Sequence, residues 1–335
     1  MRDRGVDALR ALAIAGVVCG HWLVTALVAD SGTIRVTSPL KHLPELAPVS
    51  WLLQTMALFF LVGGMVAARS TTPLRFRLAR LLRPLPALAG VWAVVVVVLL
   101  ACGADPGTVA ALAKLVWAPL WFLPVYGALM AVTPLVARLH PGWPVAVVAA
   151  VDLARFAFDA PGWVGWLNVG AAWLVPYCVG LGRRRHNGWV LLAGGAVATG
   201  VLVTAGGYPA AMVGVPGAAV SNQSPPTLAA VTFGLAQAGA ALLLLGPLRR
   251  LMRRPALWGL VAAVNLSAMT VYVWHQTALI SVTALGLPFG PLAGLHTGPD
   301  DPGWVAARLA WLPLFGLALL ACRAVFQRPV TVSPR

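Results

Sequence analysis

Acidic side chains are scarce in this sequence. The 335 residues include 9 Asp or Glu against 24 Lys or Arg, and Glu45 is the only glutamate. No paired-carboxylate site is apparent, which argues against chemistry that needs two such groups. Cysteines are also few: Cys19, Cys102, Cys178 and Cys322 lie in or beside apolar runs, without CxxC or metal-ligand spacing. We therefore expect no disulfide and no bound metal.

Lysine is almost absent, since Lys41 and Lys114 are the only two. The net charge of +15 therefore comes from arginines. A charge of this size would fit a nucleic-acid-binding protein, but the arginines form short clusters between apolar runs rather than one extended basic face. That placement is typical of membrane topology, and we expect no nucleic-acid partner.

Apolar residues, in contrast, are abundant. They make up 60% of the chain, and the mean hydropathy is +0.85. Apolar runs of about 20 residues recur, and each is long enough for a helix that crosses a bilayer. The first run follows Arg2 and Arg4, continues to about Ala29 and lacks a small-x-small cleavage site. We expect it to be a permanent helix rather than a signal peptide.

These features predict an all-α polytopic membrane protein with about ten transmembrane helices. No internal repeat and no soluble domain is apparent, so residues 1–335 would form a single membrane-embedded domain. The predicted spans are 8–29, 50–68, 85–103, 117–137, 143–158, 162–182, 189–206, 226–246, 256–286 and 303–325.

The arginines predict the orientation of these spans. With the N-terminus in the cytoplasm, the outer segments hold only Arg35, Lys41 and Lys114, besides Arg155 and Arg308 near outer helix ends. The inner segments then hold Arg2, Arg4, Arg69, Arg75, Arg77, Arg80, Arg83, Arg138, Arg183, Arg184, Arg185, Arg249, Arg250, Arg253, Arg254, Arg323, Arg328 and Arg335. This asymmetry follows the positive-inside rule and predicts that both termini are cytoplasmic.

Three ionisable residues stand out in the first apolar run. Arg10 and His21 are eleven positions apart, which places them within about 20° of one helix face and about 16 Å apart along the axis. Asp7 falls within about 40° of the same face. An ionisable group exposed to lipid is unfavourable by several kcal/mol, so this stripe should face protein or a water-filled cavity.

Each of these residues has a structural and a functional interpretation. His21 would be a hydrogen-bonded packing residue or a general base that titrates near neutrality. Arg10 would extend toward the interface, or bind a phosphate or carboxylate with its forked guanidinium. Asp7, one turn earlier, would orient Arg10 through an i,i+3 pair.

Five short motifs occur in order along the chain. They are Asp7-x-Leu9-Arg10-x-x-Ala13-x-x-x-Val17-x-x-x-His21, Leu58-Phe59-Phe60-Leu61-Val62-Gly63-Gly64, Arg77-x-x-Arg80, Trp121-Phe122-Leu123 and Tyr272-Val273-Trp274-His275. Together they resemble the acyltransferase 3 family of integral membrane acyltransferases, whose first helix has ten residues between an arginine and a histidine. The chain departs from the family pattern FF-x-x-SG at Gly63, where the family usually has a serine.

This resemblance implies a membrane enzyme, an O-acyltransferase of the bacterial plasma membrane. The donor would be a cytoplasmic acyl-CoA, used as a co-substrate rather than held as a bound cofactor. The acceptor would be a hydroxyl of an envelope glycan, a glycolipid or a small metabolite. Besides membrane lipid, these two substrates are the expected partners. Because some family members carry an extracytoplasmic domain that completes transfer, such a step would here need a separate protein.

The chemistry and helical spacing of individual residues, read beside this resemblance, suggest their roles. His21 would be the general base, with Arg10 and Asp7 in the same catalytic site. Arg77, Arg80 and Arg83 would hold the donor phosphates, although such a cluster often only sets topology. His275, Tyr272, Trp121 and Asn265 would line the acceptor cavity; packing roles are the alternative for each. We further expect one cavity lined by both Arg10 and His21.

A transporter or flippase without covalent chemistry is the alternative function. Ten spans with intramembrane charge would fit such a protein as well. Against it, the sequence has no repeated half and no pair of broken helices.

Overall fold

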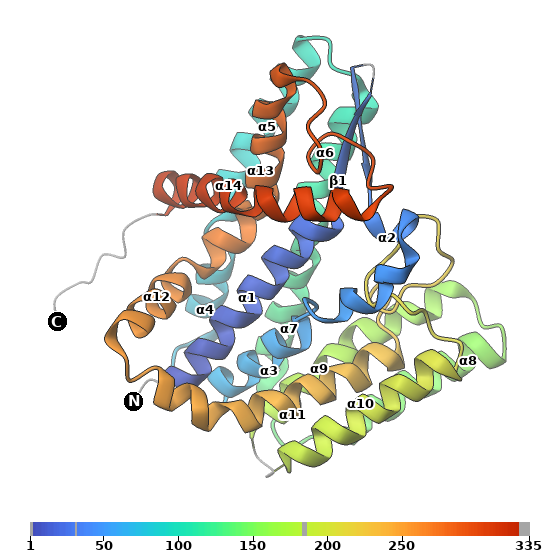
Figure 1. The fold of residues 1–335 in the computed structure, drawn as a ribbon. Coiled ribbons are helices and arrows are strands. Elements are labelled where there is room, and N and C mark those ends of the chain that lie inside the picture. Colours follow the sequence, from blue (N-terminus) through green and yellow to red (C-terminus); the bar gives the residue numbers. More distant parts are fainter. Residues whose placement is uncertain (1–2, 31, 183–185, 328–335) are drawn as a thin grey trace.

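The computed structural model describes residues 3–30, 32–182 and 186–327. This part of the chain is helical apart from one two-stranded sheet (Figure 1), which confirms the predicted class. Among the arginines used to predict orientation, Arg2, Arg183, Arg184, Arg185, Arg328 and Arg335 lie outside the described residues.

Helix α1 (Arg4–Val24) lies at the centre of the helical assembly. It packs against α3 (Met56–Ala67), α11 (Leu228–Leu251), α12 (Pro255–Leu266), α13 (Ala268–Gly286) and α14 (Pro302–Phe326). A Cβ atom added at Gly16 would lie 2.5 Å from Thr55 Cγ2, and the Thr55 hydroxyl donates to the Ala13 carbonyl over 2.8 Å. Close packing on this face therefore requires glycine at position 16.

The first helix ends earlier than predicted. Residues 26–29 are extended rather than helical, because they belong to β1 (Ala26–Asp30), which pairs antiparallel with β2 (Thr33–Thr37). Ala26 lies opposite Thr37 in this hairpin. The Ala29 amide also donates to the His296 carbonyl over 2.9 Å, which ties the hairpin to the segment before α14.

Within the described residues, seven helical segments are long and apolar enough to cross a membrane. They are Arg4–Val24, Pro44–Ala67, Leu74–Ala101, Pro106–Val136, Gly162–Leu181, Leu228–Leu251 and Pro302–Phe326. Helices α12 and α13 would supply an eighth span, although they meet at a bend of 75°. The two other predicted spans correspond to α8 (Gly142–Ala157, 16 residues) and α10 (Gly188–Thr204, 17 residues), which are shorter. Seven or eight of the ten spans are thus confirmed by length and composition, whereas the orientation stays a prediction.

Two predicted connections are in fact helical. The arginine-rich stretch expected to be an inner loop forms α4 (Leu74–Leu82), which leads into α5 (Leu85–Ala101). The span expected to begin at residue 117 begins at Pro106 and runs through α6 (Pro106–Trp117), a 3₁₀ turn η2 (Ala118–Trp121) and α7 (Phe122–Val136). Asp105 caps α6 by accepting from the Thr108 amide over 2.6 Å, and Pro106 suits the first helical turn.

Helices α3 and α9 (Asn168–Leu181) approach each other backbone to backbone. A Cβ atom at Gly64 would lie 2.1 Å from the Tyr177 carbonyl oxygen, and one at Gly180 would lie 2.0 Å from the Leu61 carbonyl oxygen. Only glycine allows so close an approach. The remaining elements are α2 (Pro39–His42) and the 3₁₀ helices η1 (Pro44–Trp51), η3 (Gly162–Leu167) and η4 (Leu287–Phe289).

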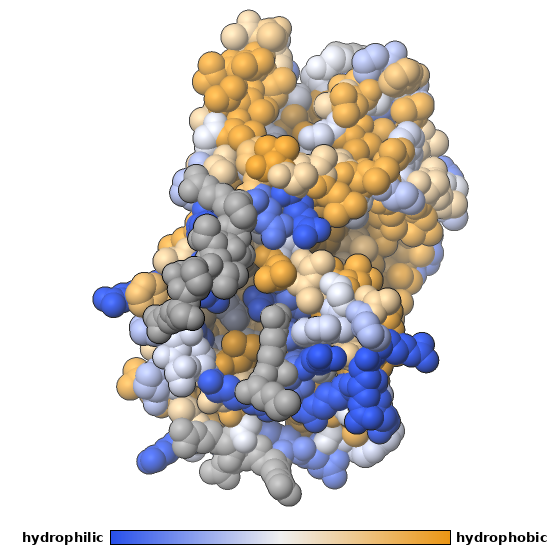
Figure 2. All heavy atoms as spheres, turned by 90° about the vertical axis from the view of Figure 1, so that its left-hand side faces the viewer, coloured by the Kyte–Doolittle hydropathy of each residue, from blue (hydrophilic) through white to orange (hydrophobic). Residues whose placement is uncertain are grey.

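The two ends of the molecule differ in polarity. Figure 2 shows one face whose upper part is mainly hydrophobic, whereas hydrophilic side chains gather in its lower part. In Figure 1 the same lower part holds the N-terminal end of α1. The hairpin and the His21 end of α1 lie toward the opposite end.

Candidate functional site

Two histidines from different helices meet near the C-terminal end of α1. The ring centroids of His21 on α1 and His275 on α13 are 5.0 Å apart, with an angle of 42° between the ring planes. The indole of Trp22 donates to the His275 carbonyl over 2.9 Å and so joins the two helices beside this pair. The structure thus brings together the first and last of the five sequence motifs.

The tautomer of His275 follows from its hydrogen bond. Its Nδ1 lies 2.6 Å from the Tyr272 carbonyl oxygen. A carbonyl oxygen only accepts, so Nδ1 carries the proton and Nε2 of the neutral ring is left as an acceptor. Nε2 is buried and has no hydrogen-bond partner among the described residues. His275 therefore holds one unpartnered acceptor atom beside His21.

His21 lies on the wall of a cavity of about 670 Å³. Of the residues predicted to line an acceptor cavity, Tyr272 and Trp121 do so. His275 is 1% exposed and is not among the lining residues, but it contacts two of them, His21 and Tyr272. Arg10 is not among the residues that line this cavity, so a space shared by Arg10 and His21 stays a prediction.

Asn265 is also placed differently from the prediction. The 75° bend after α12 separates it from Tyr272 and His275, which lie on α13. Its side-chain amide instead donates to the carbonyls of Asp7, over 2.8 Å, and Val261, over 2.9 Å. The prediction that Asn265 lines the cavity with Tyr272 and His275 assumed one continuous helix over residues 256–286, and the bend removes that continuity.

A buried arginine holds the end of α1 next to His21. Arg308 on α14 is 0% exposed and donates to the carbonyls of Trp22, Thr25 and Gly294. The last carbonyls of a helix have no partner within it, and a guanidinium there satisfies them and complements the helix dipole. The sequence suggested only that Arg308 lies near a helix end, so its role in positioning His21 was missed.

An aromatic cluster links the middle motifs to the histidine pair. Phe122 of the Trp-Phe-Leu motif packs against Phe60 at 5.2 Å, against Tyr126 at 5.2 Å and against Tyr272 at 5.4 Å between ring centroids. The Tyr272 hydroxyl donates to the Pro119 carbonyl. Motifs far apart in the sequence thus form one continuous packed unit.

Arg10 belongs to a second group of polar residues, away from the cavity. Arg10 on α1 and Arg77 on α4 are both half-buried, and both charges act on the Tyr126 hydroxyl. Arg77 also interacts with the hydroxyl of Tyr177, which lies 2.7 Å from Thr133 Oγ1. Four helices therefore converge on this inner arginine–tyrosine group, which we define as Arg10, Arg77, Tyr126 and Tyr177.

Gly63, where the family usually has serine, lies against this group. A Cβ atom at Gly63 would lie 2.5 Å from Tyr126 Cε2 and 3.0 Å from its hydroxyl oxygen. The Tyr126 ring therefore occupies the space that a serine side chain would need. The sequence showed the loss of a hydroxyl at position 63, but not that a phenol from another helix fills its place.

The other predicted donor-binding residues are arranged differently. Arg80 and Arg83 are exposed on α4 and its end, whereas Arg77 turns toward the interior. Asp7 is half-buried on the first turn of α1. Within the described part of the chain, no cluster of three His, Cys, Asp or Glu residues could hold a metal ion.

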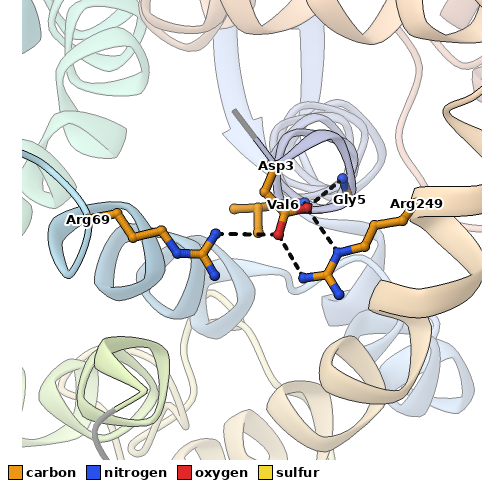
Figure 3. Close-up of polar contacts among 5 residues, drawn as sticks. All are labelled: Asp3, Gly5, Val6, Arg69 and Arg249. Atoms are coloured by element: carbon orange, nitrogen blue, oxygen red, sulfur yellow. Dashed lines mark hydrogen bonds and ion pairs between the residues drawn. The ribbon is translucent and has the colours of Figure 1, made fainter. Parts of the chain in front are cut away.

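The N-terminal end of α1 is fixed by an ion-pair cluster (Figure 3). Asp3 Oδ2 accepts from Arg249 over 2.7 Å and from Arg69 over 3.3 Å, and Oδ1 accepts from the amides of Gly5 and Val6. The hydrogen bond from Arg249 is the main reason that the pKa of Asp3 is lowered to about 2. Arg69 and Arg249 thus stabilise the start of α1, in addition to their predicted effect on membrane orientation.

This cluster predicts a pH-dependent contribution to stability. Because the pKa of Asp3 is lower in the folded protein, its contribution is present above about pH 4 and is lost as pH falls toward 2. We expect Asp3→Asn, which keeps the helix cap, to destabilise the protein at pH 7 by about 1 kcal/mol, since Arg69 and Arg249 are half-exposed or more. Thermal melts in detergent micelles should show this difference vanishing near pH 2. A difference that stays constant with pH would contradict the prediction.

The chain matches the model of a known protein family. The profile of the acyltransferase 3 family, described as an acyltransferase domain, matches residues 3–326. No curated protein and no solved structure matches the chain significantly. The matched segment contains both the histidine pair with its cavity and the inner arginine–tyrosine group.

Proposed function

Because this chain belongs to the acyltransferase 3 family and is a multi-pass membrane protein, we propose that it transfers an acyl group from a cytoplasmic acyl-CoA to a hydroxyl acceptor at His21. Family membership makes the chain an acyltransferase and decides against a carrier without covalent chemistry. The observation that carries the proposal is the position of His21, which lies on a cavity wall at one end of α1 while Arg10 lies toward the other. Donor and acceptor would approach from these opposite ends.

The proposed reaction is a direct transfer. His21 takes the proton of the acceptor hydroxyl as that oxygen attacks the thioester carbonyl. The new carbon–oxygen bond forms an ester, and the carbon–sulfur bond breaks. The proton on His21 then goes to the departing thiolate, which leaves as a free thiol. The step is balanced without a metal or an acyl-enzyme.

His275 would support the base rather than replace it. It is buried behind His21, and its Nδ1 proton is held by the Tyr272 carbonyl. Its free Nε2 could accept a hydrogen bond from a protonated His21 after a small ring rotation, since the centroids are 5.0 Å apart. That contact would stabilise the imidazolium formed in the transfer.

The inner arginine–tyrosine group is the proposed donor site. Arginine side chains bind phosphate oxygens through paired, charge-assisted hydrogen bonds. Arg10 and Arg77, whose charges both act on Tyr126, would hold the first phosphates, and the exposed Arg80 and Arg83 would meet the outer end of the nucleotide. The thioester would extend along α1, where Arg10 and His21 are about 16 Å apart along the axis.

The proposed orientation places this arginine-rich end in the cytoplasm, with about ten spans if α8 and α10 also cross the bilayer. Cysteines introduced at Arg80, at the inner end, and at Gly32, at the hairpin turn, test it. A membrane-impermeant thiol reagent applied to intact cells should label the Gly32 position and not the Arg80 position. The reverse labelling would overturn the orientation.

Purified protein in lipid vesicles tests the activity. With acetyl-CoA as donor and a mixture of hydroxylated lipids and metabolites as acceptors, free thiol release should match the amount of acylated product found by mass spectrometry. Vesicles containing His21→Ala provide the control for spontaneous thioester hydrolysis. If an acyl carrier protein thioester supports transfer and no acyl-CoA does, the CoA assignment is overturned while the acyltransferase reaction stands.

Arg77 and Arg80 should differ in their effect on the donor. We expect Arg77→Ala to raise the KM for acyl-CoA about tenfold or more, since a hydrogen bond to a charged group contributes about 1.5–3 kcal/mol. Arg80→Ala should have a smaller effect, because the exposed guanidinium interacts through solvent. Arg75→Ala, on the same helix beside Phe76, is the control. Equal effects of all three changes would show that only the overall charge matters.

A further inference from the structure

The cavity beside His21 restricts the size and polarity of the acceptor. It is formed by the C-terminal ends of α1 and β2, α2, the segment before α3, the junction of α6 and α7, the loop that precedes α11, α13 and the first part of α14. Its volume of about 670 Å³ lies in the range of small-molecule sites, about 300–1,000 Å³. A whole small molecule, rather than one hydroxyl group, can therefore enter it.

The cavity wall has no ionised partner for a charged ligand. Within the described residues, no Asp, Glu, Lys or Arg lines it. A buried phosphate or carboxylate without a partner is strongly unfavourable. The arginines lie at the other end of α1, where the donor phosphates are proposed to bind. This separation of charge favours an acceptor without charge.

Most of the wall is aliphatic. The wall is lined from five separate segments by Leu23, Leu53, Met56, Leu115, Val213 and Leu309. Burying apolar surface against such a wall is favourable by about 25 cal/mol per Å². A sugar has hydroxyl groups on all sides, and each would need a hydrogen-bond partner here.

Several polar residues on the wall are already bonded to the protein. The Gln54 amide donates to Gln223 Oε1 over 2.5 Å, and Gln54 Oε1 accepts from the Met56 amide over 3.1 Å. Ser50 accepts from the Met212 amide over 2.8 Å, and Ser38 accepts from the Leu40 amide over 3.3 Å. These side chains form hydrogen bonds within the protein, so they have few donors and acceptors left for a ligand.

Gln276 differs from them. It follows His275 on α13, lines the cavity and is 1% exposed. Neither its side-chain nitrogen nor its side-chain oxygen has a hydrogen-bond partner among the described residues. A buried amide with no partner is unfavourable by about 1–3 kcal/mol for each group, and a ligand that bonds to it removes that penalty. The amide nitrogen can thus donate and the amide oxygen can accept, one helical turn after Tyr272, which also lines the cavity.

We propose that this cavity binds an uncharged, largely apolar acceptor, and that Gln276 hydrogen-bonds its polar group beside His21. The apolar body contacts the aliphatic wall, and the hydroxyl to be acylated faces the imidazole. The proposal rests on the proposed acyl transfer, because the bound molecule is an acceptor only if transfer takes place. Binding itself does not require transfer. Polymeric glycans and anionic lipid headgroups are excluded as ligands of this cavity.

Three probes test this with the intact protein in lipid nanodiscs. Testosterone is uncharged, apolar and hydroxylated, cholate is an anion with a related ring system, and sucrose is uncharged but polar throughout. We expect saturable binding of labelled testosterone above that of empty nanodiscs, with competition by cholate and sucrose at least tenfold weaker. Sucrose or cholate binding as well as testosterone would overturn the proposal.

Two cavity variants test whether testosterone binds in the cavity. Gln276→Leu should weaken testosterone binding about tenfold, and Leu309→Trp, which fills the cavity from α14, should abolish it. His21→Ala should retain binding while losing transfer, which separates a failure of this proposal from a failure of the proposed reaction. If neither cavity variant alters binding, or if octanoyl-CoA displaces testosterone one for one, the cavity is not an acceptor site.

Discussion

Replacing His21 with alanine is expected to lower the rate of acyl transfer by about 10²–10⁴-fold, the range for loss of a general base. His21 is the only histidine on the cavity wall, and no carboxylate among the described residues lines that wall to substitute for it. The KM for acyl-CoA should change little, because the donor phosphates are proposed to bind at the other end of α1. Initial rates in vesicles, at saturating donor and acceptor, measure the effect.

The control for this change is another histidine on the same side of the molecule. His42 lies at the end of α2, 3.3 Å from Asp300, and does not line the cavity. His42→Ala should transfer at close to the wild-type rate. A His21→Ala protein that is monodisperse and retains the wild-type rate would rule out His21 as the base.

Replacing Gly64 with alanine is expected to have the largest effect on stability. The added methyl group would lie 2.1 Å from the Tyr177 carbonyl oxygen, which is backbone and cannot rotate away. Helices α3 and α9 would have to separate, and overpacking of this kind destabilises by about 1–3 kcal/mol, occasionally more. We expect a value near the upper end, about 3 kcal/mol. Unfolding in detergent, followed by circular dichroism, measures it.

Gly194→Ala provides the matched control. Gly194 is also in the interior of a helix, α10, but a Cβ atom there would meet nothing within 4 Å. The change should be neutral or slightly stabilising, by about 0.5–1 kcal/mol, since alanine loses less backbone entropy than glycine. Equal destabilisation by both changes would mean that helix packing between α3 and α9 is not the cause.

The regular features of the fold were predictable from the sequence. Apolar runs of about 20 residues identified the membrane helices, because only a helix satisfies backbone groups in lipid. The helical period put Arg10 and His21 on one face of α1. It also fixed their separation along the axis, since both depend only on local geometry.

What the sequence did not reveal depends on contacts between distant residues. No local pattern shows that Arg308 would reach the carbonyls of Trp22 and Thr25, nearly 300 positions earlier. Tyr126 fills the space beside Gly63 because α7 packs against α3, which only the tertiary structure defines. The bend that removes Asn265 from the cavity was missed for a different reason, since the apolar run continues through it without a proline or glycine.

The clamp formed by Arg308 has a consequence for biosynthesis. Of the described helices, α1 leaves the ribosome first and α14 last. The carbonyls at the end of α1 therefore lack their hydrogen bonds from Arg308 until the whole chain has been synthesised. The His21 region then takes its final shape only when α14 arrives. A nascent chain stopped before residue 302 would insert most of its helices yet lack the organised His21 region that we propose as the active centre. The acyltransferase activity of this protein therefore requires that α14 has packed against α1, and not only that the helices have entered the membrane.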